Sequence, residues 1–171
     1  MRTFIRFPKP IIGAVNGPAI GIGTTIIPFC DISYCSETTY FQSPFSRLAL
    51  APEFCSSITF PQILGRSVAN ELLLLSKQLS CKHAEELGFV SKVLPKENFM
   101  AQVLKEIESG FEYPLLDKTF PLFKNMIRKW DYELLDRVCV DELRTIDMRA
   151  RKGEISEAIR LFLKKKAAAK M

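Results

Sequence analysis

PIIGAVNGPAIGIGTTIIPFCD, residues Pro10–Asp31, is the stretch of the sequence that decides the fold. Its first part, Ile11–Val15, is a short apolar run between a proline and the turn Asn16-Gly17-Pro18, which predicts a buried β-strand. Pro18 suits the first turn of a helix, where a missing N–H costs nothing. The stretch therefore predicts a strand that turns directly into a helix.

Two glycines in this turn, Gly21 and Gly23, let the backbone pass close to another group. A strand that becomes a helix over small residues leaves unpaired N–H groups pointing at one place, with the positive end of the helix dipole behind them. Such a place binds an anion, or it stabilises an oxyanion that forms during a reaction. The same pattern fits a packing turn between strand and helix, and the motif alone leaves both interpretations open.

The composition is that of an ordinary globular protein. The 171 residues suffice for one hydrophobic core, with 47% hydrophobic and 25% charged residues. No apolar run reaches the roughly 20 residues of a membrane span, and the N-terminus lacks the apolar region of a signal peptide. The five cysteines form no CxxC pair, which predicts buried thiols in a reducing compartment.

The net charge of +5 is concentrated towards the C-terminus, where Lys164-Lys165-Lys166 and Lys170 follow one another. Such a basic cluster suits a phosphate-bearing ligand or an anionic surface. It also fits a solvated helical face. No RNA- or DNA-binding motif accompanies the charge, so we expect no nucleic-acid partner.

The rest of the chain divides into an α/β part, residues 1–95, and a helical part, residues 96–171. In the first part, residues 1–9 define no element, and Pro61 is expected to kink or divide the helix that Gly65 ends. The strands predicted there are Asp31–Ser36, Tyr40–Gln42 and Phe89–Leu94, and the helices begin at Pro52, Ser67 and Ser80. The helices predicted in the second part are Lys96–Ser109, Leu115–Lys129, Tyr132–Arg151 and Ile155–Lys166.

Carboxylates are the acid–base candidates of this sequence. The lone His83 has no Cys or His partner at metal-ligand spacing and is expected to be an exposed helix residue, so we expect no metal site. Glu53 stands among the apolar neighbours Leu50, Ala51, Pro52 and Phe54. In such surroundings its carboxylate would be desolvated and its pKa raised towards neutral pH. The alternative is an exposed glutamate in the first turn of a helix, favoured by the helix dipole.

Several motifs, in order and at matching spacing, resemble the crotonase (enoyl-CoA hydratase/isomerase) superfamily. They are VNGPAIGIG, FQSPF, PE-x-CSS-x-TFP and LS-x-x-x-A-x-x-x-GFVSKV, and they extend from about Pro8 to the helical tail. Within the superfamily they are most similar to the peroxisomal type of delta-3,delta-2-enoyl-CoA isomerase. The resemblance implies an α/β fold, namely the C-terminal part of the crotonase ββα superhelix core followed by a helical trimerisation tail.

The resemblance implies an isomerase that moves the double bond of an unsaturated fatty acyl-CoA from the 3- to the 2-position, a step of beta-oxidation. A base removes a proton from the alpha carbon, two backbone N–H groups hold the dienolate oxygen, and the base returns a proton to the gamma carbon. Glu53 matches the acid–base residue, and the N–H of Ile22 matches the second oxyanion donor. No cofactor is expected, because coenzyme A is part of the substrate.

The same resemblance implies further site residues. The expected substrate contacts are Gly21, Gly23, Phe45, Leu50 and Phe54, and the candidates for the CoA phosphates are Lys164 and Lys165. Phe54 stands where the family usually has glycine, and its bulk would narrow the acyl pocket.

The sequence also separates the isomerase from its neighbours in the superfamily. The two glutamates of crotonase hydratases correspond to Thr25 and Phe45, so hydration is not expected. A chromodomain-associated branch has Asp at the position of Glu53, which would set the carboxylate back, and a misplacement of ~1 Å is costly. Glu53 therefore favours an isomerase over a CoA-binding corepressor.

The family's first oxyanion donor lies before the position of Met1, so we expect a truncated chain that is weakly active or inactive alone, with a rate loss of roughly 10²–10³. The alternative function is a non-catalytic crotonase-like module that binds acyl-CoA or assembles with related subunits. Ala169-Lys170-Met171 resembles a peroxisomal targeting tripeptide, with the mitochondrion or cytosol as the other destinations. The resemblance also implies a homo-oligomer, a trimer or hexamer.

Overall fold

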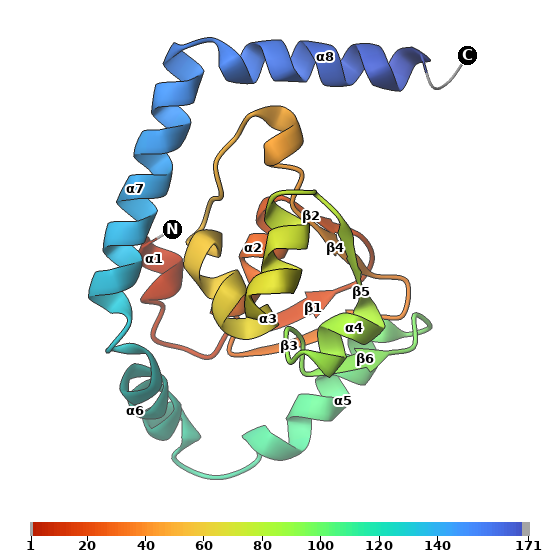
Figure 1. Cartoon of the computed structure of the whole chain (residues 1–171). Helices are drawn as coiled ribbons and strands as arrows, with labels where there is room; N and C mark the ends of the chain where they lie inside the picture. The colour runs from red at the N-terminus through yellow and green to blue at the C-terminus, as the bar shows by residue number, and fades with distance from the viewer. Residues whose placement is uncertain (1, 169–171) are drawn as a thin grey trace.

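The computed structural model describes residues 2–168. Its strands are β1 (Ile12–Val15), β2 (Ala19–Ile20), β3 (Ile32–Ser36), β4 (Tyr40–Gln42), β5 (Gln78–Ser80) and β6 (Lys92–Leu94). Its α-helices are α1 (Arg2–Ile5), α2 (Ile22–Thr25), α3 (Ser56–Leu73), α4 (Cys81–Glu86), α5 (Phe99–Phe111), α6 (Leu116–Arg128), α7 (Tyr132–Arg151) and α8 (Glu154–Ala168). Two short 3₁₀ turns are η1 (Ile27–Phe29) and η2 (Ser46–Leu48). The predicted α/β class is confirmed, and α5 to α8 run around the outside of the α/β core (Figure 1).

Two small sheets make up the strand layer of the core. In the first the order is β1-β3-β6 and all strands are parallel, with Ile12 opposite Ile32. In the second the order is β2-β4-β5, with β2 parallel and β5 antiparallel to β4. Gly13 lets β1 approach its neighbour closely, because a Cβ there would lie 2.9 Å from the Oγ of Ser33 and would displace that side chain.

The opening stretch is partly as predicted. The strand expected over Ile11–Val15 is confirmed as β1, but the helix expected to start at Pro18 is wrong. Pro18 leads into β2, which pairs with β4, and α2 begins only at Ile22. Pairing with a strand far along the chain therefore overrides the preference of proline for a helix start.

Helix α3 begins at Ser56 and not at Pro52, so the predicted start is wrong. Phe54 and Cys55 both have left-handed backbone angles, with φ of 55° and 60°, and no right-handed helix runs through such a pair. Glu53 consequently lies in the loop before the helix. Gly65, with φ 73° and ψ 157°, divides α3 as expected, whereas the helix continues through Pro61.

Besides β2 and the two 3₁₀ turns, the structure adds α1 and β5, which the sequence did not predict. The strand expected over Phe89–Leu94 is shortened to β6. In the helical part all four predicted helices are present, and α7 has the predicted bounds Tyr132–Arg151. Within residues 2–168, no helix is both long and apolar enough to cross a membrane.

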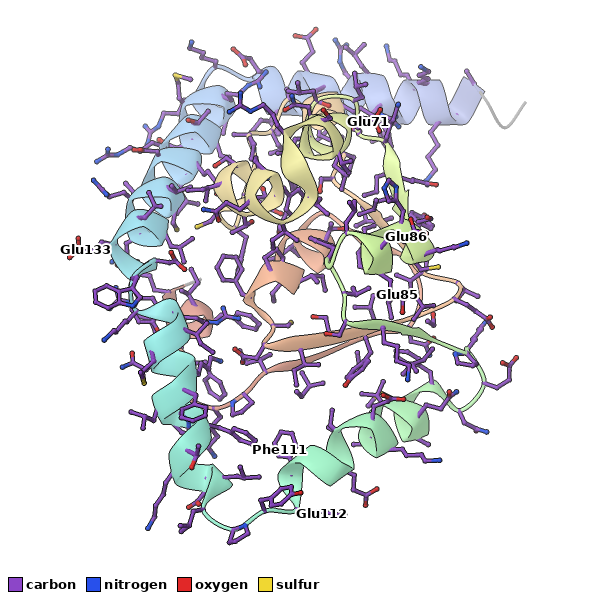
Figure 2. All side chains as sticks on the ribbon, turned by 60° about the horizontal axis from the view of Figure 1, so that its bottom comes forward. Glu71, Glu85, Glu86, Phe111, Glu112 and Glu133 are labelled. Atoms are coloured by element: carbon purple, nitrogen blue, oxygen red, sulfur yellow. The ribbon has the colours of Figure 1, made fainter. Side chains whose placement is uncertain are left out.

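The helical tail packs on the α/β core through two hydrophobic clusters. The residues of one cluster, from α1, η1, the loop before α3 and α7, are Ile5, Phe29, Phe54, Cys55, Leu135 and Cys139. Those of the other, between β3, β6 and α5, are Tyr34, Leu94, Phe99 and Val103. At the far end of α5, labelled in Figure 2, the ring of Phe111 lies 5.0 Å from that of Phe120 on α6. The tail and the core therefore share buried surface.

Candidate active site

Gly21 forms the turn between β2 and α2. Its φ of 60° and ψ of −122° belong to a region that glycine adopts readily and other residues do not. Its N–H donates to the carbonyl of Gln42 on β4 at 2.9 Å, which ties the turn to the second sheet. A Cβ on Gly23 would meet the Cβ of Ala19 at 3.9 Å, an ordinary contact. The special backbone geometry thus belongs to Gly21.

Two N–H groups are free at the start of α2. Among the hydrogen bonds of residues 2–168, none uses the N–H of Ile22 or of Gly23. Thr24 and Thr25 both donate to the carbonyl of Gly21, at 2.9 and 3.0 Å, and so close the turn behind them. The side chain of Ile22 is 56% exposed, which leaves the turn accessible from solvent. Adjacent free N–H groups can donate hydrogen bonds to an anion or oxyanion and so stabilise its charge.

Glu53 is a half-buried carboxylate in the loop between η2 and α3. In the part of the chain that the structure describes, no hydrogen bond or ion pair involves its side chain. Burial raises its pKa, and the nearby carboxylate of Glu142 raises this pKa further. The pKa shift expected from the apolar neighbours is confirmed, and the alternative of an exposed first-turn glutamate is wrong.

An aromatic contact joins the opening stretch to the Glu53 loop. The ring of Phe54 lies edge-on to Phe29 in η1, with centroids 5.2 Å apart, and is 5.9 Å from Phe4 in α1. Ile26, at the end of α2, packs on the same cluster. Because Phe54 is only 6% exposed, its ring fills this cluster. The neighbour of Glu53 is therefore held against the segment that follows the Gly21 turn.

The other predicted substrate contacts, Phe45 and Leu50, lie on either side of η2. Phe45 is buried and Leu50 is half-buried, and the N–H of Leu50 donates to the carbonyl of Phe45 at 2.9 Å. Contact of these two residues with substrate stays a prediction. Thr25, which corresponds to a hydratase glutamate, is fully buried, and its hydroxyl has no partner among the described residues. Within residues 2–168, no three His, Cys, Asp or Glu side chains are grouped as a metal site requires.

Glu142 on α7 is the one site residue that the sequence did not reveal. Its Oε2 accepts the N–H of Cys55 at 2.7 Å, and its Oε1 accepts the N–H and the hydroxyl of Ser57 at 3.0 and 2.6 Å. No local sequence pattern around Cys55 and Ser57, or around Glu142, indicates that these residues are in contact. The available signal was the helical spacing of Leu135, Cys139 and Glu142, which places the glutamate on the buried face of α7.

The basic C-terminal helix borders a cleft of about 660 Å³. The residues that line it, from η2 and α8, are Arg47, Ala158, Leu161, Phe162, Lys165 and Lys166. Lys164 is exposed on the same helix and is not one of the lining residues. The predicted targeting tripeptide Ala169-Lys170-Met171 lies outside the described residues.

The chain is similar to several curated proteins. It is 37% identical over 166 residues to Enoyl-CoA delta isomerase 2 of Rattus norvegicus, covering 97% of this chain and 42% of that protein. It is 36% identical over 171 residues to the peroxisomal Enoyl-CoA delta isomerase 3 of Mus musculus, covering 100% and 53%. It is 37% identical over 142 residues to Chromodomain Y-like protein 2 of Mus musculus, covering 82% and 28%. The chain thus spans about half the length of the two isomerases and less of the third protein.

The fold has a close match among solved structures. The enoyl-CoA hydratase/isomerase of Pseudoalteromonas atlantica T6c is 30% identical and superposes with a TM-score of 0.88, over 96% of this chain and 65% of that one. The family described as Enoyl-CoA hydratase/isomerase matches residues 1–168. The chain belongs to the enoyl-CoA hydratase/isomerase family.

Proposed function

We propose that this chain carries the catalytic base of an isomerase that converts 3-enoyl-CoA to trans-2-enoyl-CoA. The observation that carries the proposal is the carboxylate of Glu53, which is half-buried, has no hydrogen-bond partner among residues 2–168, and has a raised pKa. A general base needs a free carboxylate whose pKa lies nearer to the working pH than that of an exposed glutamate. Similarity to two enoyl-CoA delta isomerases supports the same activity.

In the proposed reaction Glu53 removes a proton from C2 of the 3-enoyl thioester. The electron pair moves into a dienolate whose oxygen accepts the N–H of Ile22, a group without a partner in the described chain. Glu53 then returns the proton to C4, which leaves the double bond between C2 and C3. One carboxylate suffices, because the proton that leaves also returns. Thr25 and Phe45 provide no second carboxylate to activate water, which favours isomerisation over hydration.

The proposal is tested by turnover of 3-hexenoyl-CoA, followed through the absorbance of the conjugated thioester and through deuterium uptake at C2. We expect slow conversion that falls by at least about 10²-fold in Glu53→Gln. The matched control is Glu86→Gln on α4, an exposed glutamate labelled in Figure 2, which should keep wild-type activity. Undiminished conversion by Glu53→Gln would contradict the proposal.

The second candidate function is binding of acyl-CoA without catalysis. The cleft beside Arg47, Lys165 and Lys166 favours it, because three cations next to an apolar wall suit a phosphate-bearing ligand. Calorimetric titration with hexanoyl-CoA separates the two functions. Saturable binding without conversion or deuterium uptake would identify a binding module, whereas Glu53-dependent conversion identifies the enzyme.

We also propose that the protein is imported into peroxisomes through Ala169-Lys170-Met171. The peroxisomal isomerase of Mus musculus supports this location. A fluorescent protein fused to the N-terminus, with Met171 free, should form punctate fluorescence that coincides with a peroxisomal marker. Lys170→Glu should make the fluorescence diffuse, since receptors of this type read a basic middle residue. Diffuse or mitochondrial fluorescence of the unchanged fusion would disprove the proposal.

A further inference from the structure

We infer that Glu142 is a positioning residue for Glu53: its carboxylate clamps the turn that joins Glu53 to α3. This inference rests on the proposed role of Glu53 as the base. Glu142 accepts three hydrogen bonds at 2.6 to 3.0 Å, from the N–H of Cys55 and from the N–H and hydroxyl of Ser57. Glu142 is only 6% exposed, so its carboxylate reaches the turn from the interior, with Cys55 buried beside it and Ser57 at the surface.

The turn needs an outside partner because of its own geometry. Phe54 and Cys55 are consecutive non-glycine residues in the left-handed region, and each such residue costs roughly 1–2 kcal/mol. Cys55 is also the N-cap of α3, and its side chain does not cap the helix. The N–H groups of Cys55 and Ser57 would therefore have no acceptor within the protein without Glu142. Glu142 supplies the missing acceptor, and its negative charge suits the positive end of the helix.

The clamp acts directly beside the base. The carbonyl of Glu53 accepts the N–H of Ser56 at 3.1 Å, between the two residues that Glu142 holds. The thiol of Cys55 adds a bond to the carbonyl of Leu135 on α7 at 3.3 Å. Through Glu142 and Leu135, helix α7 therefore fixes the position of the backbone next to Glu53. A displacement of ~1 Å at a catalytic group can cost about 10² in rate, so the clamp has a catalytic consequence.

Glu142 also acts on Glu53 through its charge. After burial, the Glu142 carboxylate is the second cause of the raised pKa of Glu53. The other titratable groups near the turn that joins Glu53 to α3 are the thiols of Cys55 and Cys139 and the carboxylate of Asp136. Burial raises the pKa of both thiols. Asp136 is paired with Arg2 of α1 and with Arg6, just after α1, at 3.0 and 2.6 Å. No ion pair of residues 2–168 neutralises Glu142. The carboxylate of Glu142 is thus held by hydrogen-bond donors, whereas the carboxylate of Glu53 stays free to exchange a proton.

The experiment measures the pKa of Glu53 by NMR, with glutamate carboxyls labelled with ¹³C and the Glu53 signal assigned by its loss in Glu53→Gln. Glu142→Gln keeps the size of the side chain and removes its charge. The control is Glu133→Gln, an exposed glutamate that projects from the outer side of α7 in Figure 2. We expect a lower pKa of Glu53 in Glu142→Gln and an unchanged one in Glu133→Gln.

Kinetics of 3-hexenoyl-CoA conversion give the second readout. In Glu142→Gln we expect kcat to fall about tenfold with KM nearly unchanged, and the pH–rate midpoint to move to lower pH. Glu142→Ala should lose about 10² in kcat or fail to fold, and partial rescue by Gln would separate positioning from mere folding. An unchanged Glu53 pKa in a folded Glu142→Gln would overturn the inference. The NMR readout needs no turnover, so it remains informative even if the unchanged chain does not convert 3-hexenoyl-CoA.

Discussion

At the scale of single residues, two glycines that look equivalent in the sequence have different roles. Gly21 adopts a backbone conformation with φ of 60° and ψ of −122°, whereas Gly23 lies in the helical turn of α2 with ordinary space for a Cβ. The constraint at Gly21 is conformational, because no atom outside the adjoining chain lies within 4 Å of the position where its Cβ would be. The sequence identified the turn but did not distinguish the two residues.

A pair of alanine variants tests this distinction. Gly21→Ala should lower the free energy of unfolding by about 1–3 kcal/mol, because a side chain is strained at its φ and ψ. Gly23→Ala should change it little or raise it by up to about 1 kcal/mol, because alanine favours helix. Urea unfolding of both variants measures the difference. Equal effects of the two substitutions would show that the geometry of Gly21 is not what matters.

The substitution Glu53→Gln should change the stability of the protein as well as its activity. The pKa of Glu53 is raised in the folded state above its ordinary value of 4.5, so its neutral form favours folding. That contribution is fully present below the unfolded-state pKa and is lost as the pH rises through the folded-state pKa. Since Gln does not titrate, Glu53→Gln should be more stable than wild type near neutral pH, and the difference should disappear in acid.

Unfolding midpoints in urea, measured across this pH range, check the prediction. A variant that is equally stable, or less stable, at neutral pH would show that ionised Glu53 carries no folding cost. The exposed control Glu86→Gln should follow wild type at every pH.

At the scale of elements, α6 is held to the α/β core by a polar contact. Asp31, just before β3, pairs with Lys124 at 2.7 Å and with Arg128 at 3.2 Å, and it accepts the N–H of Ile11 at 2.7 Å. Lys124 is 7% exposed and also donates to the carbonyl of Lys9 at 2.8 Å. This network joins the start of β1, the start of β3 and the middle of α6.

Asp31→Ala should destabilise the protein by about 3 kcal/mol, because it leaves two largely buried cations without their partner. Thermal and urea unfolding measure the loss. The comparison is Asp141→Ala, which breaks an exposed pair with Arg144 and should have no measurable effect. A small effect of Asp31→Ala would mean that water replaces the ion pair readily.

At the scale of the whole molecule, the helical tail brings its C-terminal helix back to the core. Helix α7 rises along one side and α8 crosses beside the η2 loop (Figure 1). Arg47, Lys165 and Lys166 line the cleft between η2 and α8. Many apolar side chains of the tail remain exposed, among them Leu122, Phe123, Met126 and Ile127 on α6 and Trp130 in the turn after it. We propose that these residues are covered in a homo-oligomer, which light scattering of the purified chain tests.

Binding of coenzyme A tests the cleft. Arg47→Ala and Lys165→Ala should each weaken binding about tenfold, because each removes a charged hydrogen-bond donor to a phosphate. Lys82→Ala, an exposed lysine on α4, is the control and should leave affinity unchanged. Calorimetric titration at low and high salt measures the affinities, and wild-type binding by both cleft variants would place the phosphates elsewhere.

The sequence by itself determined the elements that have local causes. Ser80 caps α4, with its hydroxyl accepting the N–H of His83 at 3.3 Å, and Gly65 interrupts α3. The long periodic pattern of α7 predicted its bounds. The apolar neighbours of Glu53 predicted a desolvated carboxylate, and the raised pKa of Glu53 in the structure has that cause first.

Only the tertiary structure decided the features whose partners are distant in the chain. Pro18 leads into β2 because β4 supplies a pairing edge, and the sequence around Pro18 holds no trace of that edge. Helix α3 starts late because Phe54 and Cys55 are held in the left-handed region, and Glu142, 87 residues after Cys55, accepts the N–H groups of Cys55 and Ser57. Local propensity acts over a few residues, whereas these hydrogen bonds form only after the chain has folded back on itself.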